Sequence, residues 1–259
     1  MAGDVPGGPA ADRPPWTLAR LAREVAARTG ETISPGHLSV VLRKGATAGV
    51  ARGTPSRGGR TRTLDHAGPR PRLLKQQAAA GDIHLLFGDE AEALTHPYLA
   101  HAWAARGADL RIAAPGQARK RALLGVLDHA RGELVVLTSG TKRSGDFVAL
   151  LGRLDRDYAP RPDRAGRPVV LVLDNGPIHT SEASREALAN RPWLTVEWLP
   201  RYAPELNDIE RSWRDLKRHY LAHRTFRDAD DLDAAIHHAV RVLNRERRAA
   251  TSAGIPKAA

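Results

Sequence analysis

Hydrophobic residues from about residue 80 onward fall into short runs that alternate with longer amphipathic stretches. The short runs predict strands, and the run VVLVLD is apolar at successive positions, which is typical of a strand buried on both faces. The predicted strands are 83–88, 109–113, 120–128, 133–138, 169–174 and 194–199. The predicted helices are 145–157, 180–190, 204–222 and 229–245.

The order of these elements indicates the fold class. Several adjacent strands come first, and helix, strand, helix, strand and two helices follow. This order predicts an α/β domain over residues 80–248 with a ribonuclease H-like core, a mixed sheet flanked by helices. The early strands are expected to pair antiparallel, and the later strands are expected to join in parallel through crossover connections.

The region before this core begins with a helical part. Residues 16–44 predict two helices, because apolar residues recur at helical spacing and Ser34 followed by Pro35 is a favourable helix start. Two helices joined by a short turn, with basic residues outside, resemble a partial helix-turn-helix, although an ordinary helical hairpin has the same pattern. Residues 1–15 and 249–259 are expected to be disordered.

A segment of different composition separates the two parts. Gly, Pro, Thr and Arg dominate residues 45–72, and no hydrophobic period is present. We therefore interpret residues 45–79 as a basic linker. Such a segment can follow phosphates or place Arg in a minor groove, but a solvated tether fits equally well.

The charge balance points to a polyanionic partner. The 259 residues contain 40 Lys and Arg against 29 Asp and Glu, which gives a formal net charge of +11. Nucleic acid is the most common partner of such proteins, although a basic protein rich in Arg and Ala needs no such partner.

The absence of Cys excludes disulfides, thiolate zinc sites and Cys nucleophiles. Because no run approaches 18 apolar residues and no signal pattern is found, we expect a cytoplasmic, nucleoid-associated protein without membrane contact.

Three acidic residues are candidates for catalysis and metal binding. Asp89 follows the apolar run IHLLFG, and Asp174 ends VVLVL, where α/β proteins place functional sites. Glu210 lies at the edge of the apolar face of a predicted helix. Acids from three separate element ends suggest a divalent-metal site for phosphoryl transfer. The alternatives are a turn or cap role for the aspartates and a Glu210–Arg214 pair across one helical turn.

Other candidate residues surround these acids in the sequence. Asn175 and His179 follow Asp174 closely and are candidates to orient a carboxylate or contact DNA, although His179 is as well explained by packing beside the next helix. Trp213 is interpreted as a core residue. The candidate DNA-binding residues are His37, Arg43, Lys44, Arg119, Lys120, Arg214 and Lys217, with Arg121, Lys142 and Arg143 as further phosphate contacts. A solvated basic face explains these cations equally well.

The segments FGDE, LDNGPIHTS and LPRYAPELNDIERSWRDLK resemble the DDE transposases of bacterial insertion sequences in the Tc/mariner superfamily. Asp174 and Glu210 are separated by 35 residues, a spacing similar to that of the family. Asp208 departs from the pattern, because the family usually has proline there. The resemblance covers about residues 80–245, and the helical region before it is shorter than the family's bipartite DNA-binding domain.

The resemblance implies a DNA transposase that cleaves strands at element ends and transfers them into target DNA. It implies that Asp89, Asp174 and Glu210 hold two Mg²⁺ ions, with Mn²⁺ as a substitute, and that the protein acts as a homodimer on double-stranded DNA with terminal inverted repeats. Two alternatives stay open. One is another ribonuclease H-like nuclease, and the other is a non-catalytic DNA-binding remnant of a transposase.

Overall fold

A computed structural model describes most of the chain. The described residues are 18–44, 49–50, 69–99, 103–104, 111–114, 116–161, 166–200 and 203–252. The segment predicted to be disordered at the N-terminus and most of the predicted basic linker lie outside these residues. None of the helices in the described parts combines the length and the apolar character needed to cross a membrane.

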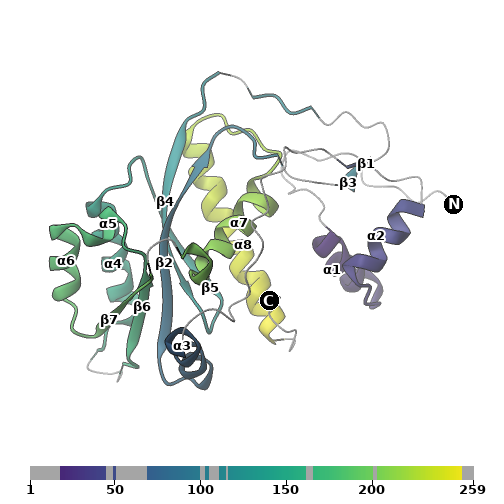
Figure 1. The fold of residues 1–259 in the computed structure, drawn as a ribbon. Coiled ribbons are helices and arrows are strands. Elements are labelled where there is room, and N and C mark those ends of the chain that lie inside the picture. Colours follow the sequence, from purple (N-terminus) through teal and green to yellow (C-terminus); the bar gives the residue numbers. More distant parts are fainter. Residues whose placement is uncertain are drawn as a thin grey trace.

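A five-stranded mixed sheet forms the centre of the protein (Figure 1). Its strands are β2 (His84–Leu94), β4 (Lys120–Asp128), β5 (Glu133–Ser139), β6 (Val169–Leu173) and β7 (Leu194–Trp198). The spatial order is β5-β4-β2-β6-β7. The early strands β2, β4 and β5 pair antiparallel, whereas β6 pairs in parallel with β2 and β7 pairs in parallel with β6. This confirms the predicted ribonuclease H-like arrangement.

Helices cover both faces of the sheet (Figure 1). One face carries α4 (Ser144–Tyr158), α5 (Pro177–Thr180) and α6 (Glu182–Ala189). The other face carries α7 (Ile209–Asp215), the π-helix η3 (Leu216–Leu221) and α8 (Ala229–Ser252). Each layer has its own hydrophobic core, one around Phe147 and Leu151 and the other around Trp213 and Ile236.

Side-chain alternation along β2 determines which residues reach which core. Leu85 and Phe87 belong to the core under α7 and α8, whereas Leu86 belongs to the core under α4. Successive side chains of a strand point to opposite faces. Asp89 therefore faces α7, and its neighbour Glu90 faces α4 and α5.

The structure corrects the position predicted for Asp89. The sequence placed this acid at the end of a strand, but β2 continues to Leu94 and Asp89 lies near its middle. The segment DEAEAL keeps the period of two, because Ala91 and Ala93 are buried and pair with β4. The predicted strand ended before Asp89, with a turn or cap role as the alternative for this acid, although a strand with small buried residues accommodates both Asp89 and Glu90.

The structure also corrects the boundary of the predicted linker. Residues Pro69–Ala80 form α3, which begins with Pro in the first turn and ends before Gly81. Gly81 has a φ of +84°, and its N–H donates to Ala78 at 3.2 Å, which is typical of a helix C-cap. Leu74 and Ala78 pack against the core under α7 and α8. The Pro- and Arg-rich start of this segment concealed its helical character.

Smaller differences concern the ends and divisions of other elements. Residues 111–114 are irregular, where part of a strand was predicted, and α8 extends to Ser252 into the predicted disordered C-terminus. The predicted helix at 204–222 is divided into a 3₁₀ turn, η2 (Pro204–Leu206), followed by α7 and η3. The π-helical segment shifts the register, so that Tyr220 and Leu221 are both buried.

The two predicted N-terminal helices are present as α1 (Leu18–Thr29) and α2 (Pro35–Lys44). The Ser34 hydroxyl accepts a hydrogen bond from the His37 N–H at 3.1 Å, as expected of an N-cap. Arg23 of α1 forms an ion pair with Glu246 of α8 at 2.9 Å, which joins the helical pair to the core. A two-residue ladder, β1 (Gly49–Val50) with β3 (Trp103–Ala104), completes the described elements. The DNA-binding role of α1 and α2 stays a prediction.

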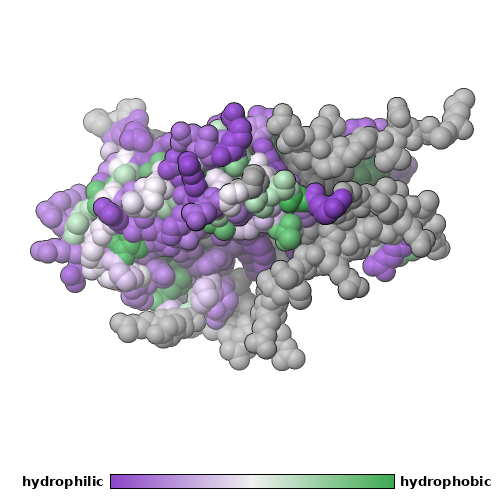
Figure 2. Space-filling model, turned by 90° about the horizontal axis from the view of Figure 1, so that it is seen from above, coloured by the Kyte–Doolittle hydropathy of each residue, from purple (hydrophilic) through white to green (hydrophobic). Residues whose placement is uncertain are grey.

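The described surface is largely hydrophilic on the side shown in Figure 2, and its hydrophobic residues lie in small patches. Such a surface favours polar partners over an extended apolar contact.

Helix α7 packs directly on the sheet through one side chain. Gly125 of β4 lies directly opposite Asp89 of β2, and the Trp213 indole occupies the space above Gly125. A Cβ atom at position 125 would lie 2.8 Å from Trp213 Cζ2. The glycine is therefore required because Trp213 enters the position of its missing side chain.

We expect Gly125→Ala to lower the free energy of unfolding by about 1–3 kcal/mol, because overpacking forces neighbouring atoms to move. Denaturant unfolding would measure the change. Gly152→Ala is the matched control, since a Cβ atom there meets no other atom within 4 Å and Ala favours the helix. Equal stability of both variants would contradict the proposed close contact.

Asp208, where the resembled family usually has proline, joins α3 to the start of α7. Its carboxylate binds Lys75 Nζ at 2.8 Å and His129 Nδ1 at 2.9 Å. Burial alone would raise the pKa of Asp208, but the hydrogen bonds from His129 and Lys75 outweigh burial and lower the pKa below its ordinary value. Asp208 is thus a structural acid rather than part of the cavity wall described below.

We expect Asp208→Asn to lower the free energy of unfolding by about 1–3 kcal/mol at pH 7, because it leaves Lys75 half-buried without its charge partner. The wild-type contribution is present above the ordinary pKa of 3.8 and is lost as the pH falls through the lower folded-state pKa. Denaturant unfolding from pH 7 to pH 3 would show the difference in free energy of unfolding becoming smaller once the pH falls below 3.8. Asp230→Asn is the control, since that side chain is 93% exposed. A pH-independent difference would count against this interpretation.

Candidate active site

The three candidate carboxylates line one cavity of about 390 Å³. Asp89 reaches it from β2, Asp174 from the end of β6, and Glu210 from the first turn of α7. The complete wall consists of Asp89, Asp174, Asn175, Gly176, Leu199, Pro200, Ala203, Pro204, Asn207 and Glu210. The fold thus brings together acids that are separated by up to 121 positions in the chain.

Asp89 is the most deeply placed of the three acids. Trp213 Nε1 donates a hydrogen bond to Asp89 Oδ2 at 3.2 Å, so the indole that packs on Gly125 also binds this carboxylate. Burial, followed by the negative charge of Glu210, raises the pKa of Asp89 to about 7. Like charges and limited solvent oppose ionisation here, and a bound cation would favour it.

Asp174 is more exposed and is held by two donors. Its Oδ1 accepts hydrogen bonds from the Gly176 N–H at 3.0 Å and from His179 Nδ1 at 2.8 Å. A Cβ atom at position 176 would lie 2.9 Å from Asp174 Oδ1, so glycine permits this close approach. Its neighbour Asn175 donates from Nδ2 to the Leu199 carbonyl at 2.6 Å, which joins the ends of β6 and β7.

Glu210 is exposed on the rim of the cavity, near the positive end of the α7 dipole. Asn207 fixes this end of the helix, because its Nδ2 donates to the Gly88 carbonyl at 3.1 Å and its backbone carbonyl accepts from the Glu210 N–H at 3.1 Å. Within the described residues, Glu210 and Arg214 do not form the ion pair considered from the sequence.

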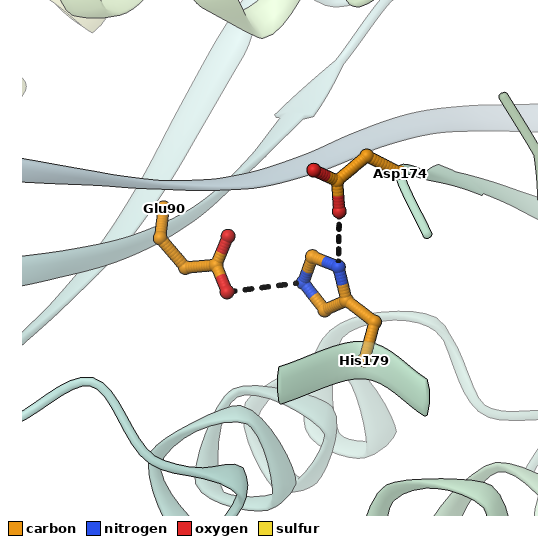
Figure 3. A group of neighbouring side chains, drawn as sticks. All are labelled: Glu90, Asp174 and His179. Atoms are coloured by element: carbon orange, nitrogen blue, oxygen red, sulfur yellow. Dashed lines mark hydrogen bonds and ion pairs between the residues drawn. The ribbon is translucent and has the colours of Figure 1, made fainter. Parts of the chain in front are cut away.

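His179 and Glu90 form a contact beside the cavity. The sequence predicted a role for His179 but not for its partner Glu90. His179 is buried on α5 and lies between Asp174 and Glu90 (Figure 3). Its Nε2 is 3.5 Å from Glu90 Oε1, and Glu90 itself was not selected as a candidate. Burial raises the pKa of Glu90, while the nearby His179 partly lowers it. The sequence signal for this position is the alternation of DEAEAL. It indicates that the strand continues and that Glu90 points to the face of β2 opposite that of Asp89.

The donor set fits a hard divalent cation. Three carboxylates converge, and the buried Asn207 Oδ1 has no hydrogen-bond partner among the described residues. Mg²⁺ and similar cations prefer oxygen ligands of this kind and need open positions for water or phosphate. The pKa of Asp89 is raised first by burial and then by the charge of Glu210, and a bound cation would oppose both effects.

The candidate DNA-binding residues are dispersed. Lys120 pairs with Glu92 at 3.3 Å, and Arg121 pairs with Asp230 and Asp233 at 2.9 and 3.0 Å. Lys217 is half-buried; burial lowers its pKa, and the charge of Glu210 opposes that change. Lys120 is exposed, and the other exposed members are His37, Arg43, Arg119, Lys142, Arg143 and Arg214. The side chain of Lys44 lies outside the described part of the chain.

Known proteins similar to this chain include two curated relatives. An uncharacterized 39 kDa protein of insertion element IS630 from Shigella sonnei is 31% identical over 132 residues, which are 51% of this chain and 37% of that protein. The uncharacterized protein y4pE/y4sA from Sinorhizobium fredii is 29% identical over 99 residues, which are 38% of this chain and 64% of that protein. The matches therefore cover less than two thirds of the length of either relative.

Solved structures of similar arrangement include complexes of the Mos1 transposase. The paired-end complex with the left transposon end gives a TM-score of 0.47 at 17% identity, covering 93% of this chain and 78% of that chain. The Mos1 mariner paired-end complex with Mn gives a TM-score of 0.45 at 19% identity, covering 94% and 75%.

A family model described as DDE superfamily endonuclease matches residues 84–233, the stretch that contains all three carboxylates of the cavity. This match confirms the resemblance carried by the FGDE, LDNGPIHTS and LNDIERSWRDLK motifs. Because it spans more than half of the 259 residues, the chain belongs to the DDE superfamily endonuclease family.

Proposed function

We propose that this protein is a DNA transposase that cleaves strands at the ends of a mobile element and transfers them into target DNA. The observation that carries this proposal is the meeting of Asp89, Asp174 and Glu210 on one cavity in a chain of the DDE endonuclease family. The acids come from three different elements, so their meeting requires the tertiary fold and is not a consequence of local sequence.

The proposed cofactor is a pair of divalent cations, Mg²⁺ with Mn²⁺ as a substitute, held by these three carboxylates. When bound, such ions activate the attacking oxygen and stabilise the leaving oxygen of an in-line displacement at phosphorus. Asp89 lines the cavity from β2, Asp174 lines it from the end of the neighbouring strand β6, and Glu210 lines it from α7. Asn207 keeps the Glu210 end of α7 against β2 through its bond to the Gly88 carbonyl.

The proposed substrate is double-stranded DNA, bound by a homodimer at terminal inverted repeats. The net charge of +11 favours attraction to phosphates. Lys217 and Arg214 lie on the segment that follows Glu210, and the effect of the Glu210 charge on the pKa of Lys217 supports a role of this cation near the acids. We assign to these two cations the role of holding DNA phosphates beside the cavity. The helices α1 and α2 are the proposed sequence-reading part, and nucleoid association in the cytoplasm would follow from DNA binding.

We expect Glu210→Gln to reduce Mg²⁺-dependent strand cleavage at least about 100-fold, because loss of a metal ligand removes several kcal/mol of transition-state stabilisation. Cleavage would be measured on a duplex that carries the inverted repeats flanking the gene. Folding and DNA affinity should change little, since Glu210 is exposed and has no ion pair with Arg214 among the described residues.

Glu205→Gln is the matched control for this experiment. Glu205 is also exposed and precedes Glu210 by five residues, but it does not line the cavity. Equal cleavage by wild type and Glu210→Gln would contradict the assignment of the third acid. A wild type that binds the repeats but never cleaves them would favour the non-catalytic remnant.

We expect DNA affinity to fall steeply with salt, because each neutralised phosphate releases counterions. A plot of the logarithm of the association constant against that of the salt concentration should be linear, with a negative slope of several units. Arg214→Gln should make this slope shallower by about one unit, whereas Arg227→Gln, on the loop before α8 and paired with Asp231, should not. An affinity independent of salt would contradict phosphate binding.

A further inference from the structure

We propose that His179 is a positioning residue that, together with Glu90, braces the middle of β2 against the end of β6 so that Asp174 presents Oδ2 to the cavity. This inference deepens the proposed metal-dependent function and rests on it. Neither His179 nor Glu90 lines the cavity, so the brace acts from behind the carboxylates rather than as part of the reacting site.

The orientation of Asp174 needs an explanation, because its side chain is 52% exposed. An aspartate at such a position can adopt several rotamers. Here Oδ1 is engaged by two donors, the Gly176 N–H at 3.0 Å and His179 Nδ1 at 2.8 Å. With Oδ1 held on the α5 side, Oδ2 is the oxygen left for a ligand.

The second contact of His179 connects this carboxylate to the neighbouring strand. Its Nε2 lies 3.5 Å from Glu90 Oε1, and the two ring nitrogens thus face carboxylates on two different strand segments (Figure 3). Glu90 directly follows Asp89 and points to the opposite face of β2. A brace between Glu90 and Asp174 therefore also fixes the separation of Asp89 and Asp174.

The imidazole is held rigidly enough to serve this role. Its ring is buried and packs edge-on against Phe147, with ring centres 4.7 Å apart. Thr180 donates from Oγ1 to the Gly176 carbonyl at 3.1 Å, and Ser184 donates to the Ile178 carbonyl at 2.6 Å, which secures the short helix α5 on both sides of His179. A fixed imidazole can orient the exposed Asp174 carboxylate, whereas we do not expect that carboxylate to orient the buried ring.

The burial of Glu90 supports a role beyond packing. Its side chain is 8% exposed, and its Oε1 has no hydrogen bond among the described residues apart from the longer ion-pair contact with His179. An ionisable group in this position is unfavourable for stability, and an apolar residue of similar size would pack there without that penalty. We therefore assign to the Glu90 carboxylate the role of holding the His179 ring in its orientation.

Two substitutions separate the two contacts of the ring. The amide nitrogen of Asn occupies about the place of Nδ1, and that of Gln about the place of Nε2, because each is the same number of bonds from Cβ. His179→Asn therefore keeps a donor to Asp174, and His179→Gln keeps a donor to Glu90. His238→Gln, on the exposed face of α8, is the control.

The experiment measures Mg²⁺ and Mn²⁺ affinity by titration calorimetry on the full chain, together with strand cleavage and melting temperature. We expect metal affinity to fall about 10–100-fold in His179→Gln, as is usual when a group behind a metal ligand is removed. His179→Asn should retain most of the affinity even if both variants lose similar thermal stability. Glu90→Gln should lower the affinity less, and its effect should not add to that of His179→Gln.

Gly176→Ala provides an independent test that leaves His179 intact. Its φ of −62° and ψ of 152° suit alanine, but the new Cβ atom would press on Asp174 Oδ1. We expect metal affinity to fall in this variant as well, with little change in melting temperature.

The outcomes distinguish the brace from the proposed function. A wild type that binds no divalent cation would overturn both. A wild type that binds and cleaves, with Asn and Gln variants impaired equally and in proportion to their melting temperatures, would overturn the brace alone. The three ligand atoms of Glu90, Asp174 and His179 lie within 4.8 Å of one another, so a Zn²⁺ ion bound there in the wild type and lost in every variant would show a metal site instead.

Discussion

The close approach of α7 to the sheet is the contact on which the candidate site depends. Trp213 enters the space that a side chain at Gly125 would fill, and from there its indole reaches Asp89 on the next strand. This contact sets how near the helix lies to β2, and with it how near Glu210 comes to Asp89. One glycine in a strand and one tryptophan on a helix thereby determine whether two acids share a cavity.

Hydrogen-bond donors around the acids partly offset their mutual repulsion. Asp89 receives the indole N–H, and Asp174 receives a backbone N–H and an imidazole nitrogen. The indole and backbone N–H groups carry no net charge, and the His179 ring contacts Glu90 as well as Asp174, so these groups orient the carboxylates without replacing a cation. The raised pKa of Asp89 reflects its burial first and the remaining repulsion from Glu210 second. The side chains of such a site are oriented to bind a cation, and the protein itself does not supply the positive charge that would balance the carboxylates.

The sequence predicted the sheet well because its signals are local. The run VVLVL is typical of a strand buried on both faces, and the order of the elements predicted the antiparallel and parallel pairings. The three carboxylates were selected from the sequence, but the reason given, a position at an element end, fails for Asp89 in the middle of β2. Contacts across the fold could not be predicted in the same way. The register that places Gly125 opposite Asp89 and the ion pair that docks α3 both depend on partners far away in the chain.

The contact between Asp208 and Lys75 has a consequence for how these two positions evolve. The two residues are 133 positions apart, yet each compensates the charge of the other in a half-buried position. A lineage that replaced Asp208 by proline would leave Lys75 with an unmatched charge, and selection would then favour a neutral residue in α3. The two positions should therefore change together in evolution, and their covariation among relatives would identify which members of the family dock α3 against the core.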